Sequence, residues 1–346
     1  GSRAGKKRDD ELSLGEALKL CEDLAQLGCR RLTLGGGDPL LREDWPIIAQ
    51  KLIDSGVMVG MVTNGLAWSD KVTETVKAIG LESVAFSIDG LEESHDYLRG
   101  VKGLWRKVLG AVKSCRAAGV HASAVTTIYR RNLDELEALR DVLRENGVER
   151  WQLQVGTPTG NLADHPDLVI APEDMLTLVP RIAKICRDGR APRVYPGHNI
   201  GYYGEPEEML RDPRDPIPFW TGCPAGLSVI GIESNGGIKG CLSLPSMMNG
   251  EDRFLEGNIR ETPLREIWYR KGAFSYNRDF TLDNLGGECK TCDYAEVCRG
   301  GCTWGNVARD RFVRDNPYCY WRQLQLAEAK DQHNDQQDKT HLRVVS

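Results

Sequence analysis

Seven of the eleven cysteines in this 346-residue chain stand in closely spaced groups toward its C-terminal end. They are Cys223, Cys241, Cys289, Cys292, Cys298, Cys302 and Cys319. The Cys289-x2-Cys292 pair allows two thiolates from one turn to reach one metal centre. Thiolates grouped in this way bind either structural zinc or an iron–sulfur cluster, and the spacing leaves both open. Two sites with four ligands each would need one ligand more than these cysteines supply.

The remaining cysteines and the composition favour a reducing compartment. The other four thiols fall on predicted helices or at their ends, where small apolar side chains pack into a core: Cys21, Cys29, Cys115 and Cys186. Clustered thiols in a long chain without a signal peptide favour the cytoplasm over a secreted disulfide scaffold. The net charge of -5 argues against a nucleic-acid partner. No apolar run approaches the roughly 20 residues of a membrane span, so we expect no membrane partner.

Ahead of these cysteines, residues 11–155 alternate amphipathic helical stretches with short β-branched runs. Ser13 and Glu16 form the pattern of a capping box at the start of the first helix, and Asn132 is expected to cap a later one. The predicted strands are residues 31–34, 57–62, 83–88, 121–127 and 150–155. Strands that alternate with helices predict an α/β fold whose parallel sheet is wound in the right-handed sense.

Polar or glycine-containing groups stand where these strands end. They are residues 35–39, 63–65, 89–90 and 126–127, and Gln154. Periodicity does not separate a doubly wound sheet from a barrel segment, but barrels build their sites at such strand ends. The pattern therefore favours a partial barrel. Farther along, residues 227–232 and 238–242 flank a Gly-bearing loop and predict a hairpin that brings Cys223 and Cys241 together.

The cysteine pattern resembles the SPASM domain of radical S-adenosylmethionine (SAM) peptide maturases, and the βα array resembles their partial (β/α)6 barrel. The resemblance covers about residues 11–321. It implies a radical SAM partial barrel over residues 1–190, a bridging region and a SPASM auxiliary-cluster domain over residues 191–322, and a C-terminal helix or tail over residues 323–346. It also decides between zinc and iron in favour of iron–sulfur clusters.

The resemblance implies an interleaved ligation of two auxiliary [4Fe–4S] clusters. One cluster would take Cys289, Cys292, Cys298 and Cys319. The other would take Cys223, Cys241 and Cys302. Several relatives place a fourth cysteine between the first two positions of the motif, and this chain has none there. The second cluster therefore has an iron that is open to a substrate atom or takes a ligand from elsewhere.

The strand ends resemble the SAM-binding segments of the same family. Gly36, Gly37, Asp38 and Pro39 resemble its Gly-Gly-Glu-Pro motif, with Asp in place of Glu. Glycines let the backbone approach a ligand closely, and exposed carbonyls can accept hydrogen bonds from the SAM ammonium group.

Further along the array, Ser87 and Asp89 resemble the Ser-x-Asp-Gly segment that lies beside SAM in the family. Arg99 follows where relatives place an arginine on the SAM carboxylate, and its planar guanidinium suits that pairing. Asn64 and Gln154, also at strand ends, are further candidates for polar contact with SAM or substrate.

Radical SAM chemistry needs a Cys-x3-Cys-x2-Cys loop for its own [4Fe–4S] cluster, and residues 1–346 contain no such motif. We expect this loop upstream of Gly1, in which case the numbered chain alone does not cleave SAM; a degenerate relative that only binds a partner is the alternative. The resemblance implies an enzyme reduced by a donor such as flavodoxin or ferredoxin. Its 5′-deoxyadenosyl radical would abstract hydrogen from a ribosomally made precursor peptide and lead to a crosslink within it.

Two rival functions remain open. The first is sulfatase maturation to formylglycine, in which relatives use an Asp directly after the second cysteine of the motif as a base. Leu242 follows Cys241 here, which counts against it. The second is a non-catalytic, zinc-stabilised barrel that binds a peptide. Iron and sulfide in anaerobically prepared protein would separate the enzyme from this zinc protein.

Overall fold

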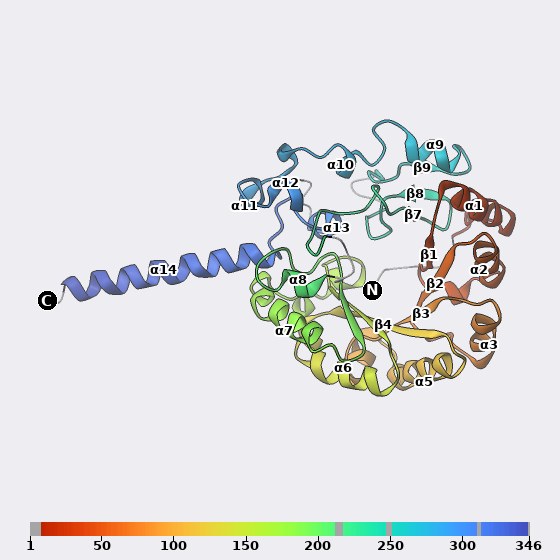
Figure 1. The fold of residues 1–346 in the computed structure, drawn as a ribbon, viewed down its shortest axis with the longest axis horizontal. Coiled ribbons are helices and arrows are strands. Elements are labelled where there is room, and N and C mark those ends of the chain that lie inside the picture. The colour runs from red at the N-terminus through yellow and green to blue at the C-terminus, as the bar shows by residue number, and fades with distance from the viewer. Residues whose placement is uncertain (1–7, 212–216, 247–250, 310–312, 345–346) are drawn as a thin grey trace.

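The structure is a computed structural model that describes residues 8–211, 217–246, 251–309 and 313–344. Its main feature is a curved sheet of six parallel strands in chain order, with helices along its outer side (Figure 1). The strands are β1 (Arg31–Leu34), β2 (Met58–Thr63), β3 (Ser83–Ser87), β4 (His121–Ile128), β5 (Arg150–Val155) and β6 (Arg193–Pro196). Because every neighbouring pair of strands is parallel, all six strands end at one edge, as in an open barrel.

Helices connect these strands and cover the convex side of the sheet. They are α1 (Leu14–Leu27), α2 (Trp45–Asp54), α3 (Asp70–Ala78), α4 (Glu92–Arg99), α5 (Leu104–Ala117), α6 (Leu136–Glu145) and α7 (Met175–Arg187). The predicted capping box of α1 is present, since Ser13 accepts from the Glu16 amide and Glu16 accepts from the Ser13 amide. Ser69 likewise caps α3 through the amide of Val72. The α/β class and the partial barrel are confirmed.

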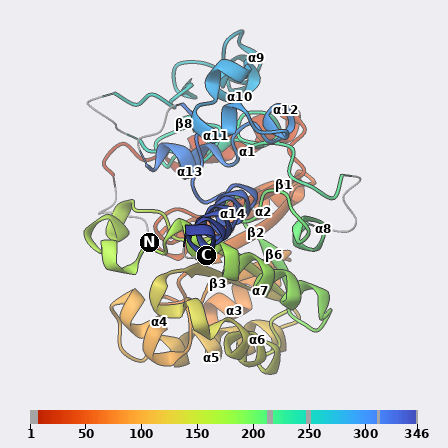
Figure 2. The ribbon, with the colours of Figure 1, turned by 90° about the vertical axis from the view of Figure 1, so that its left-hand side faces the viewer.

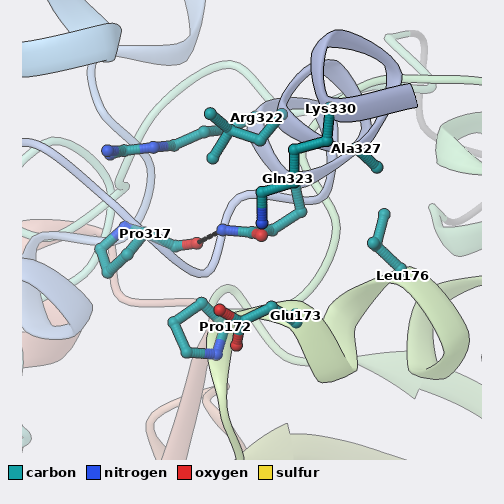
Figure 3. Close-up of a pocket in the computed structure, with 9 residues that line it drawn as sticks. Pro172, Glu173, Leu176, Pro317, Arg322, Gln323, Ala327 and Lys330 are labelled. Carbon is teal, nitrogen blue, oxygen red and sulfur yellow. Dashed lines mark hydrogen bonds between the residues drawn. The ribbon is translucent and has the colours of Figure 1, made fainter. Parts of the chain in front are cut away.

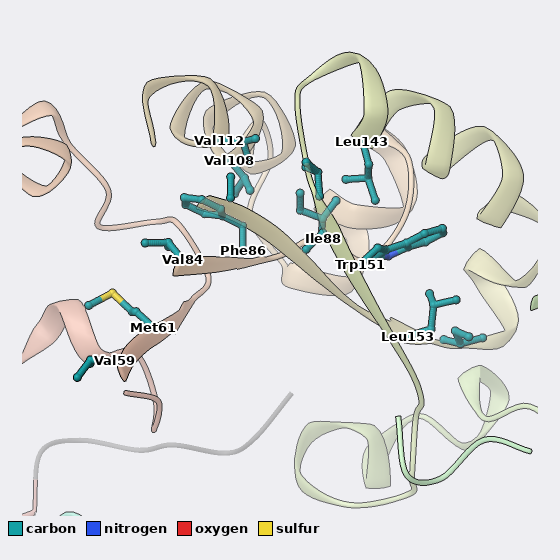
Figure 4. Packing of buried hydrophobic residues seen from close by; sticks show 14 of the residues in the cluster. Val59, Met61, Val84, Phe86, Ile88, Val108, Val112, Leu143, Trp151 and Leu153 are labelled. Carbon is teal, nitrogen blue, oxygen red and sulfur yellow. The ribbon is translucent and has the colours of Figure 1, made fainter. Parts of the chain in front are cut away.

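The core lies between the sheet and these helices (Figure 4). Val108 and Val112 of α5 pack toward Phe86 of β3, and all three side chains are fully buried. Each large apolar side chain buried in this way contributes about 1.5–3 kcal/mol. Trp151 of β5 is also fully buried, and its indole N–H donates to the hydroxyl of Thr126 at 2.8 Å. The strand ends are therefore held on a rigid support.

The cysteine-rich part lies across from the concave side of the sheet (Figures 1 and 2). It contains the small antiparallel sheet β7 (Gly231–Ile232), β8 (Gly237–Lys239) and β9 (Gly257–Asn258), and the short helices α9 (Leu264–Tyr269), α10 (Ser275–Arg278), α11 (Gly287–Lys290), α12 (Ala295–Cys298) and α13 (Thr303–Val307). The short helix α8 (Glu207–Leu210) instead packs against α7 of the barrel. The predicted hairpin is present as β7 and β8. It is tied to the barrel because Leu12 donates its N–H to the carbonyl of Ser234 at 2.8 Å.

The chain then continues as α14 (Tyr320–Val344), which projects away from the body (Figure 1). The base of α14 meets the start of α7 at a shallow cavity (Figure 3). Gln323 of α14 is buried in this seam. Its side-chain amide donates to the carbonyl of Pro317 at 2.8 Å, and its main-chain N–H donates to the carbonyl of Cys319. The seam thus fixes the segment that carries the last predicted ligand. Of the helices in the described ranges, none combines the length and the apolar character that crossing a membrane requires.

Three features differ from the sequence-based expectation. The sheet has β6 as a sixth strand, which is short and half-buried and ends in Pro196, so it shows no alternating pattern. Helix α4 was not expected, because its sequence is mostly polar. Asn132 does not cap α6, whose N-cap is Glu135; it is buried in the preceding 3-10 turn, where its side chain bonds to two strand ends.

Candidate cofactor sites at the strand ends and among the cysteines

The loop after β1 is open toward solvent at its glycines. Gly36 and Gly37 are exposed, and Gly36 has a φ of 111°, which favours glycine. A Cβ atom on Gly36 would meet no other atom within 4 Å. The main chain of this loop is therefore accessible to a ligand, as predicted for the SAM ammonium group.

The carboxylate of Asp38 is directed into the protein and joins the ends of β1 and β2. It accepts the hydroxyl of Thr63 at 2.9 Å, the amide of Asn64 at 2.8 Å and the amide of Leu40 at 3.1 Å. Asp38 is 9% exposed and Thr63 is 1% exposed. The side chain of Asn64 accepts the amide of Leu66 at 2.8 Å and so closes its own turn. Asp38 and Asn64 thus position the loop, while the buried Pro39 begins a 3-10 turn behind it.

The ends of β3, β4 and β5 gather a second set of the predicted residues. Asp89 is 2% exposed, and its carboxylate accepts the amide of Thr127 at 2.8 Å. Its other oxygen pairs with the guanidinium of Arg99 at 2.7 Å. Gln154 donates to the hydroxyl of Thr127 at 3.1 Å, and Ser87 is half-buried at the last position of β3. The structure therefore brings Asp89, Arg99 and Gln154 together around one strand end.

Arg99 retains a donor that nothing in the described residues satisfies. Its Nε atom is buried and has no hydrogen-bond partner there, although one of its terminal nitrogens is held by Asp89. An unsatisfied buried donor is costly, so such an atom indicates a ligand or water. This observation fits the predicted contact of Arg99 with the SAM carboxylate.

Sequence reasoning missed several residues that hold this set. His95 is fully buried, and its Nδ1 accepts the amide of Asp89 at 3.1 Å. Burial lowers the pKa of His95 to about 4, so the ring is neutral at pH 7. Asn132 donates to the carbonyls of Asp89 and Thr127 at 3.0 and 2.8 Å. The carboxylate of Glu135 accepts hydrogen bonds from the start of α4, the helix that contains Arg99. These residues share no periodic pattern, so no sequence signal could have grouped them.

Four of the predicted ligands line one cavity in the cysteine-rich part. They are Cys289, Cys292, Cys298 and Cys319. Buried aromatic side chains complete its wall, including Tyr202 and Tyr203, and Trp321 lies beside them. Burial, followed by the neighbouring thiolates, raises the pKa of Cys319 to about 12. Thiols are the donor groups of iron–sulfur centres, and a bound metal centre deprotonates them.

The other three predicted ligands form an adjacent group. Cys302 and Cys223 share a hydrogen bond, which lowers the pKa of the Cys223 thiol and raises that of Cys302. The Cys241 thiolate contributes to the raised pKa of Cys302. Four thiols thus line one cavity and Cys223 contacts Cys302, while the division of all seven between two clusters stays a prediction.

These two sets fit iron–sulfur clusters. All eleven cysteines are free thiols. Across the described ranges, three or more His, Cys, Asp or Glu side chains do not gather closely enough to hold one metal ion. The donor sets are nevertheless made of thiols, which is the ligand chemistry of [4Fe–4S] clusters. The first set offers a complete complement of four thiols, and the second offers three.

Family models match both parts of this architecture. The model of the radical SAM superfamily matches residues 2–167, and that of the SPASM iron-sulfur cluster-binding domain matches residues 223–303. The chain therefore carries a radical SAM domain followed by a SPASM domain. Its cofactors are therefore SAM and [4Fe–4S] clusters. The superfamily match covers the first five strands and their ends, and the SPASM match covers six of the seven clustered cysteines.

Known radical SAM proteins resemble the chain over most of its length. An AdoMet-dependent heme synthase of Methanosarcina barkeri is 29% identical over 320 residues, which is 90% of this chain and 88% of that protein. A PqqA peptide cyclase of Ruegeria pomeroyi is 24% identical over 86% of this chain and 75% of its own. The crystal structure of Streptococcus suis SuiB bound to the precursor peptide SuiA superposes with a TM-score of 0.69 at 15% identity, covering 91% of this chain and 71% of SuiB. That likeness confirms the fold.

Proposed function

We propose that this radical SAM enzyme oxidises a ribosomally made precursor peptide and closes a crosslink within it. The observation that carries the proposal is the pair of adjacent thiol sets opposite the SAM-binding strand ends. A second support is the similarity to a PqqA peptide cyclase over 86% of the chain. The proposal also covers the ligation itself, with one auxiliary cluster on the set of four thiols and another on Cys223, Cys241 and Cys302.

Crosslink formation removes two hydrogens from the peptide, and the chain must provide for both. One leaves as an atom that SAM chemistry transfers to 5′-deoxyadenosine. The other leaves as a proton and an electron when the new bond forms. Bound iron–sulfur clusters supply the acceptor for that electron. In this proposal the electron is released at the strand ends, and the two thiol sets lie in the part of the protein that faces them.

The chain's own residues bind and orient SAM. The exposed loop at Gly36 and Gly37 offers main-chain carbonyls to its ammonium group, and Asp38 holds that loop against β2. Arg99, fixed by Asp89, offers the unsatisfied Nε–H to its carboxylate. Holding the target carbon next to the radical turns the abstraction into an effectively intramolecular step.

The test is incubation of the intact, anaerobically prepared protein with SAM, a low-potential reductant and the peptide encoded by a neighbouring small reading frame. We expect 5′-deoxyadenosine and a peptide that is lighter by two hydrogens, with a linkage that tandem mass spectrometry locates. A peptide carrying formylglycine instead would indicate the sulfatase-maturase reaction. Colourless protein that contains zinc and no sulfide would refute the enzyme altogether.

A second candidate substrate is an iron porphyrin. It is favoured by the heme synthase of M. barkeri, which matches this chain over more of its length than the peptide cyclase does. Oxidation of a porphyrin side chain needs the same hydrogen abstraction and the same electron acceptor. Parallel incubation with an iron porphyrin separates the two substrates, because SAM-dependent turnover of the porphyrin with an unchanged peptide would contradict the peptide proposal.

A further inference from the structure

Arg314 is a buried arginine whose main chain is fixed next to the predicted cluster ligands. It is 4% exposed. Its amide donates to the carbonyl of Asn284 at 2.9 Å, and its carbonyl accepts the amide of Gly286 at 3.1 Å. The loop it pairs with leads directly into α11, which contains Cys289. The position of Arg314 is therefore coupled to that of a predicted ligand.

The guanidinium of Arg314 contacts the segment between Cys298 and Cys302, which joins the two thiol sets. One terminal nitrogen donates to the carbonyl of Arg299 at 2.9 Å, and Arg299 stands between Cys298 and Cys302. Gly300 packs so closely that a Cβ atom there would lie 2.6 Å from the Cβ of Arg314. Cys298 belongs to the first thiol set and Cys302 to the second. The same side chain thus supports a ligand of each set.

The other terminal nitrogen of Arg314 reaches a network that ends on a ligand. It donates to the side-chain oxygen of Asn277 at 2.7 Å and to the carbonyl of Tyr276. The hydroxyl of Thr303 donates to the same Asn277 oxygen at 3.0 Å, and Thr303 is hydrogen-bonded to the thiol of Cys223. This network connects the guanidinium with the second thiol set.

Among the residues that the structure describes, no carboxylate balances the charge of Arg314. Its hydrogen-bond acceptors are all neutral carbonyl oxygens, and within the described ranges no Asp or Glu forms an ion pair with it. A buried charge without a counter-charge is strongly unfavourable. Burial lowers the pKa of Arg314, whereas the thiolates of Cys223, Cys302 and Cys298 raise it. The hydrogen bonds of Arg314 lead to predicted ligands of both sets, through Arg299 to Cys298 and through Asn277 and Thr303 to Cys223.

We propose that Arg314 is the shared counter-ion of the two auxiliary clusters and raises their reduction potentials. A [4Fe–4S] cluster with its thiolates is anionic and gains one more negative charge on reduction. A fixed positive charge in a low-dielectric surrounding therefore stabilises the reduced state more than the oxidised one. The inference rests on the auxiliary clusters and not on the substrate proposed above.

The experiment is an EPR-monitored redox titration of the reconstituted chain and of three variants. R314Q removes the charge, and R314K keeps it. R278Q is the matched control, because Arg278 also donates to two carbonyls, those of Gly226 and Trp268, and is half-buried in the same domain. Because residues 1–346 contain no Cys-x3-Cys-x2-Cys motif, the signals come from auxiliary clusters alone.

We expect R314Q to shift the reduction equilibrium of at least one cluster tenfold toward the oxidised form, which is about 59 mV for one electron. The shift should be larger for the cluster on Cys223 and Cys302, because the hydrogen-bond network from Arg314 through Asn277 and Thr303 ends on Cys223. R314K and R278Q should stay near the wild-type potentials. Equal potentials in R314Q and wild type would overturn the proposal, as would equal shifts in R314Q and R314K.

Cluster loading provides a second readout if R314Q does not assemble. The iron and sulfide content of the variants then shows whether the charge of Arg314 or its packing is required. Normal loading of R314K together with loss in R314Q supports a counter-ion. Loss in both Arg314 variants with normal loading of R278Q shows that the arginine is needed for packing, which overturns the proposal.

Discussion

Asp38 is predicted to stabilise the fold through the junction of the first two strand ends. Replacing it by alanine leaves the hydroxyl of Thr63 and the amide of Asn64 without their acceptor. A buried donor left unsatisfied costs about 1–3 kcal/mol, and of these donors only the Thr63 hydroxyl is buried, so D38A should lower the free energy of unfolding by about 1–3 kcal/mol. The amides of Asn64 and Leu40 also lose their acceptor, but both residues are half-buried and water can reach them. Urea unfolding followed by circular dichroism measures the change, with the slope expected to stay constant.

The matched control is D134N. The side chain of Asp134 is 96% exposed and pairs with Arg181 at 3.3 Å, and exposed ion pairs of this kind contribute about 0–1 kcal/mol. A second variant, D38N, keeps the shape and one acceptor oxygen, so its loss should fall between those of D38A and D134N. If D38A lowers the free energy of unfolding no more than D134N does, then Asp38 does not stabilise the junction of the two strands. Its carboxylate would then be available for a ligand.

Three further predictions concern metal content, pH and backbone conformation. C289A should lose the iron and sulfide of one cluster, whereas C115A, which alters a buried core thiol, should keep both by chemical analysis. His95 takes up a proton near pH 6.5 in the unfolded state but only near pH 4 in the folded state. The free energy of unfolding is therefore at its full value above pH 6.5 and falls by about 3 kcal/mol as the pH drops toward 4. H95Q should lack this loss in unfolding curves. G65A should destabilise the protein more than G80A, by about 1–3 kcal/mol in the same assay. Both glycines have a positive φ, but only at Gly65 would an added Cβ meet a side chain, lying 2.8 Å from Val108.

The sequence predicted the elements whose packing imposes a clear pattern. Strand β4 alternates between buried and less buried positions, and strands β1 and β5 begin and end where predicted. Helix α4 was missed because it holds Arg99 and His95 at the strand ends and its sequence is mostly polar. Hydrophobic periodicity reports burial against a core, so an element held mainly by polar contacts gives no such signal.

The candidate site was predictable by residue type but not by role. Spacing and resemblance gave the seven thiols and the strand-end residues, and the structure groups them. The direction of the Asp38 carboxylate could not be predicted, because its partners Thr63 and Asn64 are 25 and 26 residues away in the chain. Arg314 gave no signal for the same reason, since its environment is made by segments around residues 277, 284 and 299.

Tyr202 links the end of the barrel to both thiol sets. It is fully buried with a φ of 76°, a conformation that costs energy for a residue other than glycine and persists only where the surroundings require it. Its hydroxyl donates to the carbonyl of His198, just after β6, and accepts the amide of Cys302 at 3.1 Å. Its ring lines the cavity of the first set, and its carbonyl accepts from the thiol of Cys319. Through its side chain and its main chain, this one residue thus ties the end of the sixth strand to a predicted ligand of each set.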